Sequence, residues 1–110
     1  MAEKKDTEKK IQQLQMMEQS VQNMLMQKQQ FQAQQMEAEA ALKELEGSKE
    51  AYKILGNIMV ATKKEDLQKE LEEKKKKLGI RIKTIEKQES EIKEKAEKTR
   101  KEVVSEMKKE

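Results

Sequence analysis

The feature that most constrains this chain is an apolar stripe that repeats at alternating intervals of three and four residues. Its positions are Leu14, Met17, Val21, Met24, Lys28, Phe31, Gln35, Ala38, Leu42 and Leu45. This spacing, kept for more than four heptads, is the a/d pattern of a coiled coil, and only Lys28 and Gln35 in it are polar. Because the same stretch contains no Gly or Pro and is rich in good helix formers, we predict a helix over about residues 7–46.

A second stripe follows in the other half of the chain. Its positions are Leu71, Lys75, Leu78, Ile82, Ile85, Glu89, Ile92, Ala96, Thr99 and Val103. It predicts a second helix over about residues 63–108, and Thr62-Lys63-Lys64-Glu65 fits a capping box at its start. Gly47 follows the first helix at the position where a C′ residue is expected.

Between the two helices lies a hairpin signal. Residues 51–55 and 58–62 are rich in apolar and β-branched side chains, and they flank Gly56-Asn57, so a two-residue turn pairs Leu55 with Ile58. Gly56 supplies the positive φ that such a turn requires. An isolated hairpin with apolar residues on both faces is marginal in water and leaves two open edges. We therefore expect it to join other strands in an oligomer through Tyr52, Ile54, Ile58 and Val60.

The two stripes are consistent with a chain that folds back on itself. If the chain folds back at the Leu55/Ile58 turn, stripe residues equally far from the turn in sequence face each other in layers. These layers are Leu14/Thr99, Met17/Ala96, Val21/Ile92, Phe31/Ile82 and Leu42/Leu71. The other layers each carry one polar member, among them Met24/Glu89, Lys28/Ile85 and Gln35/Leu78, so we expect a stalk that is helical but not rigid. The predicted fold is mainly α: a long antiparallel two-helix coiled coil joined by a central β-hairpin, within a single domain of residues 1–110.

Composition excludes most enzymatic and membrane functions. The 110 residues include no Cys or His, so we expect no metal site, no cofactor and no catalysis of the Ser-His-Asp or Cys-His type. Charged residues make up 43% and hydrophobic residues 34%, and no apolar run approaches the length of a membrane span. Since no secretory signal is visible either, we expect a cytoplasmic protein that is not an enzyme.

The central segment resembles a known family. The run Tyr52-Lys53-Ile54-Leu55-Gly56-Asn57-Ile58-Met59-Val60, followed by Thr62-Lys63-Lys64-Glu65-Asp66-Leu67, is similar to the centre of the beta class of archaeal prefoldin subunits. Residues 84–89 resemble the second helix of the same family, and the similarity extends from about Ile11 to Met107. The hairpin between two matched helices is the specific part of this likeness.

The resemblance implies an assembly and an activity. Prefoldin is a hexamer of two alpha and four beta subunits, whose hairpins form inter-subunit β-barrels and whose coiled coils project from them. The coiled-coil tips hold non-native polypeptides and deliver them to a group II chaperonin without ATP. One hairpin per chain implies the beta class, with an alpha-type subunit as partner. The Gln- and Met-rich first helix and the run Lys74–Lys77 depart from the family pattern and leave the client contacts open.

The client-binding residues are expected at the end of the coiled coil that carries both termini. Met suits promiscuous apolar surfaces because its side chain is flexible and polarizable. We assign client binding to Ile11, Leu14, Met16, Met17, Val103, Val104 and Met107. The alternative for the off-stripe residues is a widened interface between helices.

Three other interpretations stay open from the sequence. A structural coiled-coil scaffold would have the same stripes but would not suppress aggregation. A basic coiled-coil binder of nucleic acid would show salt-dependent affinity, although Lys74–Lys77 also fits a solvated face paired with Glu one turn earlier, and we expect neither nucleic acid nor a membrane as partner. An engineered variant of the family is the third.

Overall fold

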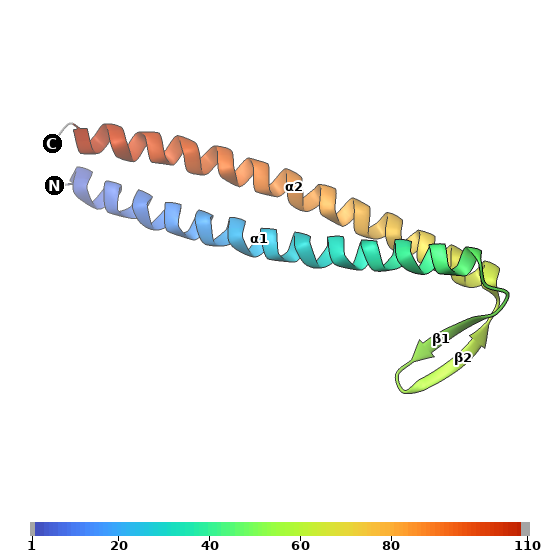
Figure 1. The fold of residues 1–110 in the computed structure, drawn as a ribbon. Helices are drawn as coiled ribbons and strands as arrows, with labels where there is room; N and C mark the ends of the chain where they lie inside the picture. Colours follow the sequence, from blue (N-terminus) through green and yellow to red (C-terminus); the bar gives the residue numbers. More distant parts are fainter. Residues whose placement is uncertain (1, 109–110) are drawn as a thin grey trace. The chain divides into compact units, whose positions relative to one another are not determined.

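Two long helices flank a short antiparallel hairpin, as predicted (Figure 1). The computed structural model describes residues 2–108, with side chains from residue 4 onward. Helix α1 spans Ala2–Glu46, strands β1 and β2 span Ala51–Leu55 and Ile58–Thr62, and helix α2 spans Lys64–Lys108. The first helix therefore begins before residue 7, where its predicted span starts.

The chain divides into two compact units. One unit combines α1 as far as Lys28 with α2 from Thr84 onward, and the other runs continuously from Gln29 to Lys83 and contains the hairpin. We call them the terminal unit and the hairpin unit.

The coiled-coil stripe is the core of both units. The buried apolar positions of the helices all belong to the predicted stripes: Ala38, Leu45, Leu78 and Ile82 in the hairpin unit and Ile85, Ala96 and Val103 in the terminal unit. Ala51, the first residue of β1, is also buried. Every other stripe position is at least half-buried. No large side chain among the described residues is completely buried, because two helices can cover only one face of each other.

The hairpin has the predicted register. The pairs run from Ala51 with Thr62 to Leu55 with Ile58, in a sheet of these two strands. Gly56 has a φ of 62°, while Asn57 has no positive φ, so the turn is of type II′, in which Gly occupies the first central position.

The junctions next to the hairpin differ from the predicted caps. Gly47 does not adopt a positive φ, and the end of α1 is closed instead by the Ser48 N–H, which donates to the Leu45 carbonyl at 3.2 Å. The capping box at Thr62 is wrong, because Thr62 still belongs to β2. The N-cap position falls to Lys63, whose carbonyl accepts the first helical hydrogen bond from Leu67 at 3.1 Å.

Two polar members of the stripes pair with each other. The sequence placed Lys28 opposite Ile85 and Glu89 opposite Met24, in separate layers. In the terminal unit the Lys28 Nζ lies 3.0 Å from the Glu89 Oε1, and the two side chains are only 18% and 9% exposed. Each charge neutralises the other across adjacent layers, so the two polar residues destabilise the coiled coil less than two unpaired buried charges would.

A third polar member, Gln35, bonds to the backbone of the facing helix. In the hairpin unit its Nε2 donates to the Lys75 carbonyl at 3.3 Å. A Cβ built on Gly79, one turn further along α2, would lie 3.3 Å from the same nitrogen. A glycine in the middle of a helix costs about 1 kcal/mol relative to Ala, and here its missing side chain leaves room for the Gln35 amide.

We predict that Glu89→Ala lowers the free energy of unfolding by about 2–4 kcal/mol, because a mostly buried ammonium loses its partner. Replacing both partners, as Lys28→Met with Glu89→Leu, should leave stability equal or higher. Urea unfolding followed by circular dichroism at fixed protein concentration measures both.

The matched control is Glu18→Ala, which removes an exposed carboxylate from its ion pair with Arg100. Exposed pairs contribute about 0–1 kcal/mol. Equal losses from Glu89→Ala and Glu18→Ala would contradict the buried-pair interpretation.

A double-mutant cycle tests the fit between Gln35 and Gly79. Gly79→Ala should stabilise the chain by about 0.5–1 kcal/mol in a Gln35→Ala background, where only helix propensity changes. In the native background the gain should be smaller or absent, because the new methyl group crowds the Gln35 amide. Identical effects in both backgrounds, measured by urea unfolding, would show that the two residues do not interact.

Candidate functional site

The seven residues assigned to client binding divide into two groups in the terminal unit. Met16 and Met107 are 71% and 60% exposed, and Ile11 and Val104 are also exposed. Leu14 and Met17 are half-buried, and Val103 is buried at 6% exposure. The first group presents apolar surface to solvent, whereas the second forms the helix–helix seam beneath it.

Polar contacts hold the start of α1 against the end of α2. The Thr7 hydroxyl donates to the Glu106 Oε2 at 2.5 Å, and Lys10 pairs with Glu106 and, at 3.4 Å, with Glu102. The apolar residues of this unit are therefore displayed on a closed helix pair.

These contacts also affect the ionisation of Lys10. The hydrogen bond to Glu106 raises the Lys10 pKa above its ordinary value. A raised lysine pKa contributes stability that is complete below the ordinary value, and the contribution is lost when the pH rises through the raised one. The contact is therefore intact at neutral pH.

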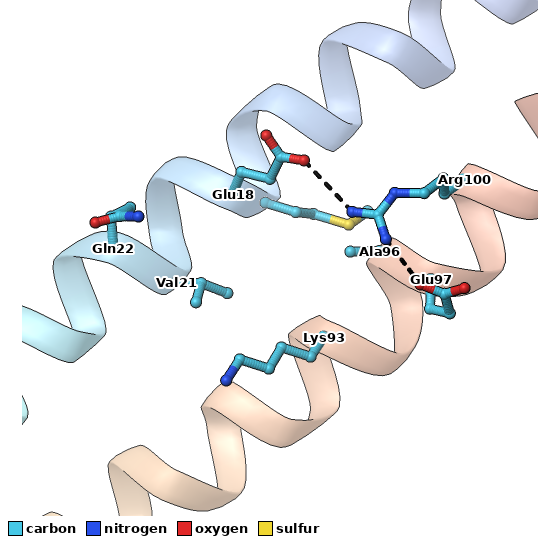
Figure 2. A pocket seen from close by; sticks show the side chains of 8 residues that line it. Glu18, Val21, Gln22, Lys93, Ala96, Glu97 and Arg100 are labelled. Carbon is cyan, nitrogen blue, oxygen red and sulfur yellow. Dashed lines mark hydrogen bonds and ion pairs between the residues drawn. The ribbon is translucent and has the colours of Figure 1, made fainter.

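A groove lies between the helices in the same unit (Figure 2). Its volume is about 430 Å³, and Met17, Val21 and Ala96 supply its apolar part. Figure 2 shows Arg100 reaching toward Glu18 and Glu97, with its guanidinium nitrogens 3.5 and 2.8 Å from their carboxylate oxygens. The small Ala96 side chain leaves space in the seam, and Met17 and Ala96 line it together, as their predicted layer requires.

The described residues around the groove lack a ligand set for a metal ion. Among residues 4–108, no cluster of three or more His, Cys, Asp or Glu side chains could hold a metal ion. Beside the groove Arg100 pairs with Glu18 and Glu97, and the open apolar part of the groove suits contact with an apolar side chain.

The second candidate surface is the hairpin. Tyr52, Ile54, Ile58 and Val60 are all exposed, with Ile54 at 70%. Paired residues of an antiparallel sheet share a face, so Ile58 and Val60 lie on one face and Tyr52 and Ile54 on the other. Near the turn both faces of the sheet are therefore open within the hairpin unit, whereas Ala51 at the base of the hairpin is buried. Both edges of the two-stranded sheet lack a partner strand in this unit.

Side-chain contacts fix the first strand to its surroundings. The Tyr52 hydroxyl donates to the Glu50 Oε2 at 2.9 Å, and the Lys53 Nζ donates to the Glu70 Oε1 of α2 at 2.5 Å. The Lys64 Nζ donates to the Glu46 carbonyl at 3.3 Å, across the base of the hairpin.

The predicted sites omit two exposed hairpin residues, Leu55 and Met59. Leu55 pairs with Ile58 and lies on the face of Ile58 and Val60. Met59 pairs with Ile54 and lies on the opposite face, with Tyr52 and Ile54. The predicted register already contained this information, because a residue opposite an exposed apolar residue shares its face. Leu25, Met26 and Met36 on α1 are also exposed and lie outside both predicted sites.

Among the described residues, neither helix is apolar enough over a sufficient length to cross a membrane.

Comparison with known proteins identifies the family. The family described as "Prefoldin subunit" matches residues 8–110. The prefoldin subunit beta of Archaeoglobus fulgidus is 40% identical over 87 residues, which cover 76% of this chain and 75% of that protein. The corresponding subunit of Methanothrix thermoacetophila is 37% identical over 83 residues, covering 73% and 69%.

A solved structure agrees with these relatives. The crystal structure of the prefoldin beta subunit from Thermococcus strain KS-1 superposes with a TM-score of 0.83 and 31% identity, over 91% of this chain and 90% of that one. The chain therefore belongs to the prefoldin family, in its beta class, and the members of this family are chaperone subunits that assemble with other prefoldin subunits and are not enzymes.

Proposed function

We propose that this chain is a holdase subunit that captures non-native polypeptides through the exposed apolar residues of its terminal unit. It would deliver them to a group II chaperonin without ATP. The observation that carries the proposal is the exposure of Ile11, Met16, Val104 and Met107, which lie outside the seam that covers their neighbours. Unfolded chains expose apolar side chains of their own, and exposed apolar patches are typical of protein-binding surfaces.

The buried and half-buried members of the predicted site have a supporting role in this proposal. Leu14, Met17 and Val103 pack in the seam and hold the two helices together beneath the exposed residues. Clients would contact the exposed group first, and the open groove beside Met17 could accept an apolar client side chain.

A single contact surface of this size binds weakly, so affinity must come from several copies. In the proposed assembly the chain joins an alpha-type prefoldin subunit, with two alpha and four beta subunits, through a β-barrel built from the hairpins. Several tethered tips then bind one client with a high effective concentration. The exposed hairpin, with its two open edges, supports this route to assembly.

Replacing Ile11, Met16, Val104 and Met107 with Ser should abolish the suppression of client aggregation and leave assembly intact, because these side chains are exposed and do not stabilise the seam. Light scattering of a denatured client during refolding measures the activity, and scattering of the protein itself measures the assembly.

The control for this variant is Met26→Ser with Met36→Ser, which removes two similarly exposed methionines outside the proposed site. Suppression by the control should equal that of the native protein. Full suppression by the four-residue variant would overturn the proposal, and a coiled-coil scaffold without client binding would then explain the fold.

Ile54→Lys with Ile58→Lys should prevent assembly, because it places a charge on each apolar face of the hairpin. The chain alone and the chain mixed with an alpha-type subunit are compared by multi-angle light scattering. The matched control, Met36→Lys, introduces a charge at an equally exposed site on α1 and should assemble normally. Assembly of the hairpin variant to the native mass would exclude the hairpin as the assembly module.

A further inference from the structure

The thioether is the principal target for peroxide in this chain. The sequence contains eight Met but no Cys and no Trp, so mild peroxide has no thiol or indole to attack. Five of the methionines are 60–71% exposed, and their side chains lie outside the seam: Met16, Met26, Met36, Met59 and Met107. Met17 and Met24 occupy seam positions and are half-buried.

Adjacent methionines on α1 differ sharply in exposure. Met16 is 71% exposed, whereas Met17, the next residue, is half-buried between the helices beside Ala96. Met26 is 63% exposed, whereas Met24 is half-buried. Because oxidation depends on contact between sulfur and oxidant, each exposed residue has an internal control in a nearly identical sequence environment.

Two of the exposed methionines belong to the client-binding surface. Met16 on α1 and Met107 on α2 both lie in the terminal unit, and each is more exposed than Ile11 or Val104. They therefore supply much of the accessible apolar character of that surface.

We propose that Met16 and Met107 form a modification site at which peroxide reversibly switches off client capture; the effect on clients rests on the proposed function. The thioether sulfur attacks one peroxide oxygen, so that an S–O bond forms as the O–O bond breaks. The sulfur loses two electrons and becomes a sulfoxide, and the peroxide is reduced to water after proton transfer. A dithiol-dependent methionine sulfoxide reductase reverses the change and leaves a disulfide and water.

The structure favours loss of binding over loss of folding. A sulfoxide is polar and forms strong hydrogen bonds with water, so it removes apolar surface from the positions that would contact a client. The seam is spared, because its two described methionines, Met17 and Met24, are half-buried and react slowly. Oxidised protein should therefore remain helical while it loses affinity for unfolded chains.

The first experiment maps the oxidation on the full-length assembled protein. Trypsin cleavage after Lys10 and Lys28 gives one peptide, residues 11–28, that contains Met16, Met17, Met24 and Met26. After a timed hydrogen peroxide treatment, tandem mass spectrometry of this peptide should show oxidation several-fold faster at Met16 than at Met17, and at Met26 than at Met24. Equal rates within both pairs would overturn the proposed selectivity.

The second experiment measures client protection after peroxide relative to the same variant before peroxide. Native protein should lose most of its suppression, and the two methionine sulfoxide reductases together, one for each sulfoxide epimer, should restore it. Met16→Leu with Met107→Leu, which conserves volume and cannot form a sulfoxide, should keep its own untreated activity. The matched control, Met26→Leu with Met36→Leu, should lose activity as the native protein does.

The outcomes separate the two proposals. Native protein that fails to protect a client before any treatment refutes the holdase function. Native protein that protects equally before and after complete oxidation of Met16 and Met107, with circular dichroism unchanged, overturns the switch alone. Loss of activity in the Met16→Leu/Met107→Leu variant at the native rate also overturns it, because another site would then be responsible.

Discussion

The packing of one apolar stripe on α1 against one on α2 is the interaction on which the rest of this structure depends. The two 45-residue helices bury one row of stripe side chains between them, and the largest described residues keep part of their surface in water. A core of this kind has no interior in which additional apolar residues could be placed. A large apolar side chain on the far side of α1 from the stripe, such as Met26 or Met36, is therefore exposed in the chain, and it either meets another molecule or stays in water.

Polar residues in the stripes limit the ways in which the helices can slide. A slip of one heptad in one direction would bring Lys28 opposite Leu78, eleven residues from Glu89, and leave both charges without each other. A slip in the other direction would bring Gln35 opposite Ile85, ten residues from Lys75, and end its bond to the Lys75 carbonyl. Each contact tolerates one slip and opposes the other, so the two together select the observed register.

Much of this could be predicted from the sequence, because the period of the apolar residues specifies which face of each helix is covered. The exposure of Met16, Val104 and the hairpin residues follows from that period and from the two-residue turn. The Lys28–Glu89 pair was not predicted, since layer-by-layer pairing ignores the length of a lysine side chain, which reaches a neighbouring layer. The predicted N-cap of α2 at Thr62 also differed from the structure, because Thr62 pairs as the last residue of β2 and the helix begins after Lys63.

The two exposed surfaces differ in what they can recognise. Between their ends the helices bond their own backbone N–H and C=O groups, so apart from the first turn of α1 and the last turn of α2 the terminal unit offers side chains, and its apolar contacts are non-directional. In the hairpin, each strand has a partner on one side only and retains a row of backbone donors and acceptors on the other. Directional hydrogen bonds require a partner strand of matching register, whereas thioether and aliphatic contacts accept many sequences. Selective association is therefore expected of the hairpin, and tolerance of unrelated partners is expected of the terminal unit.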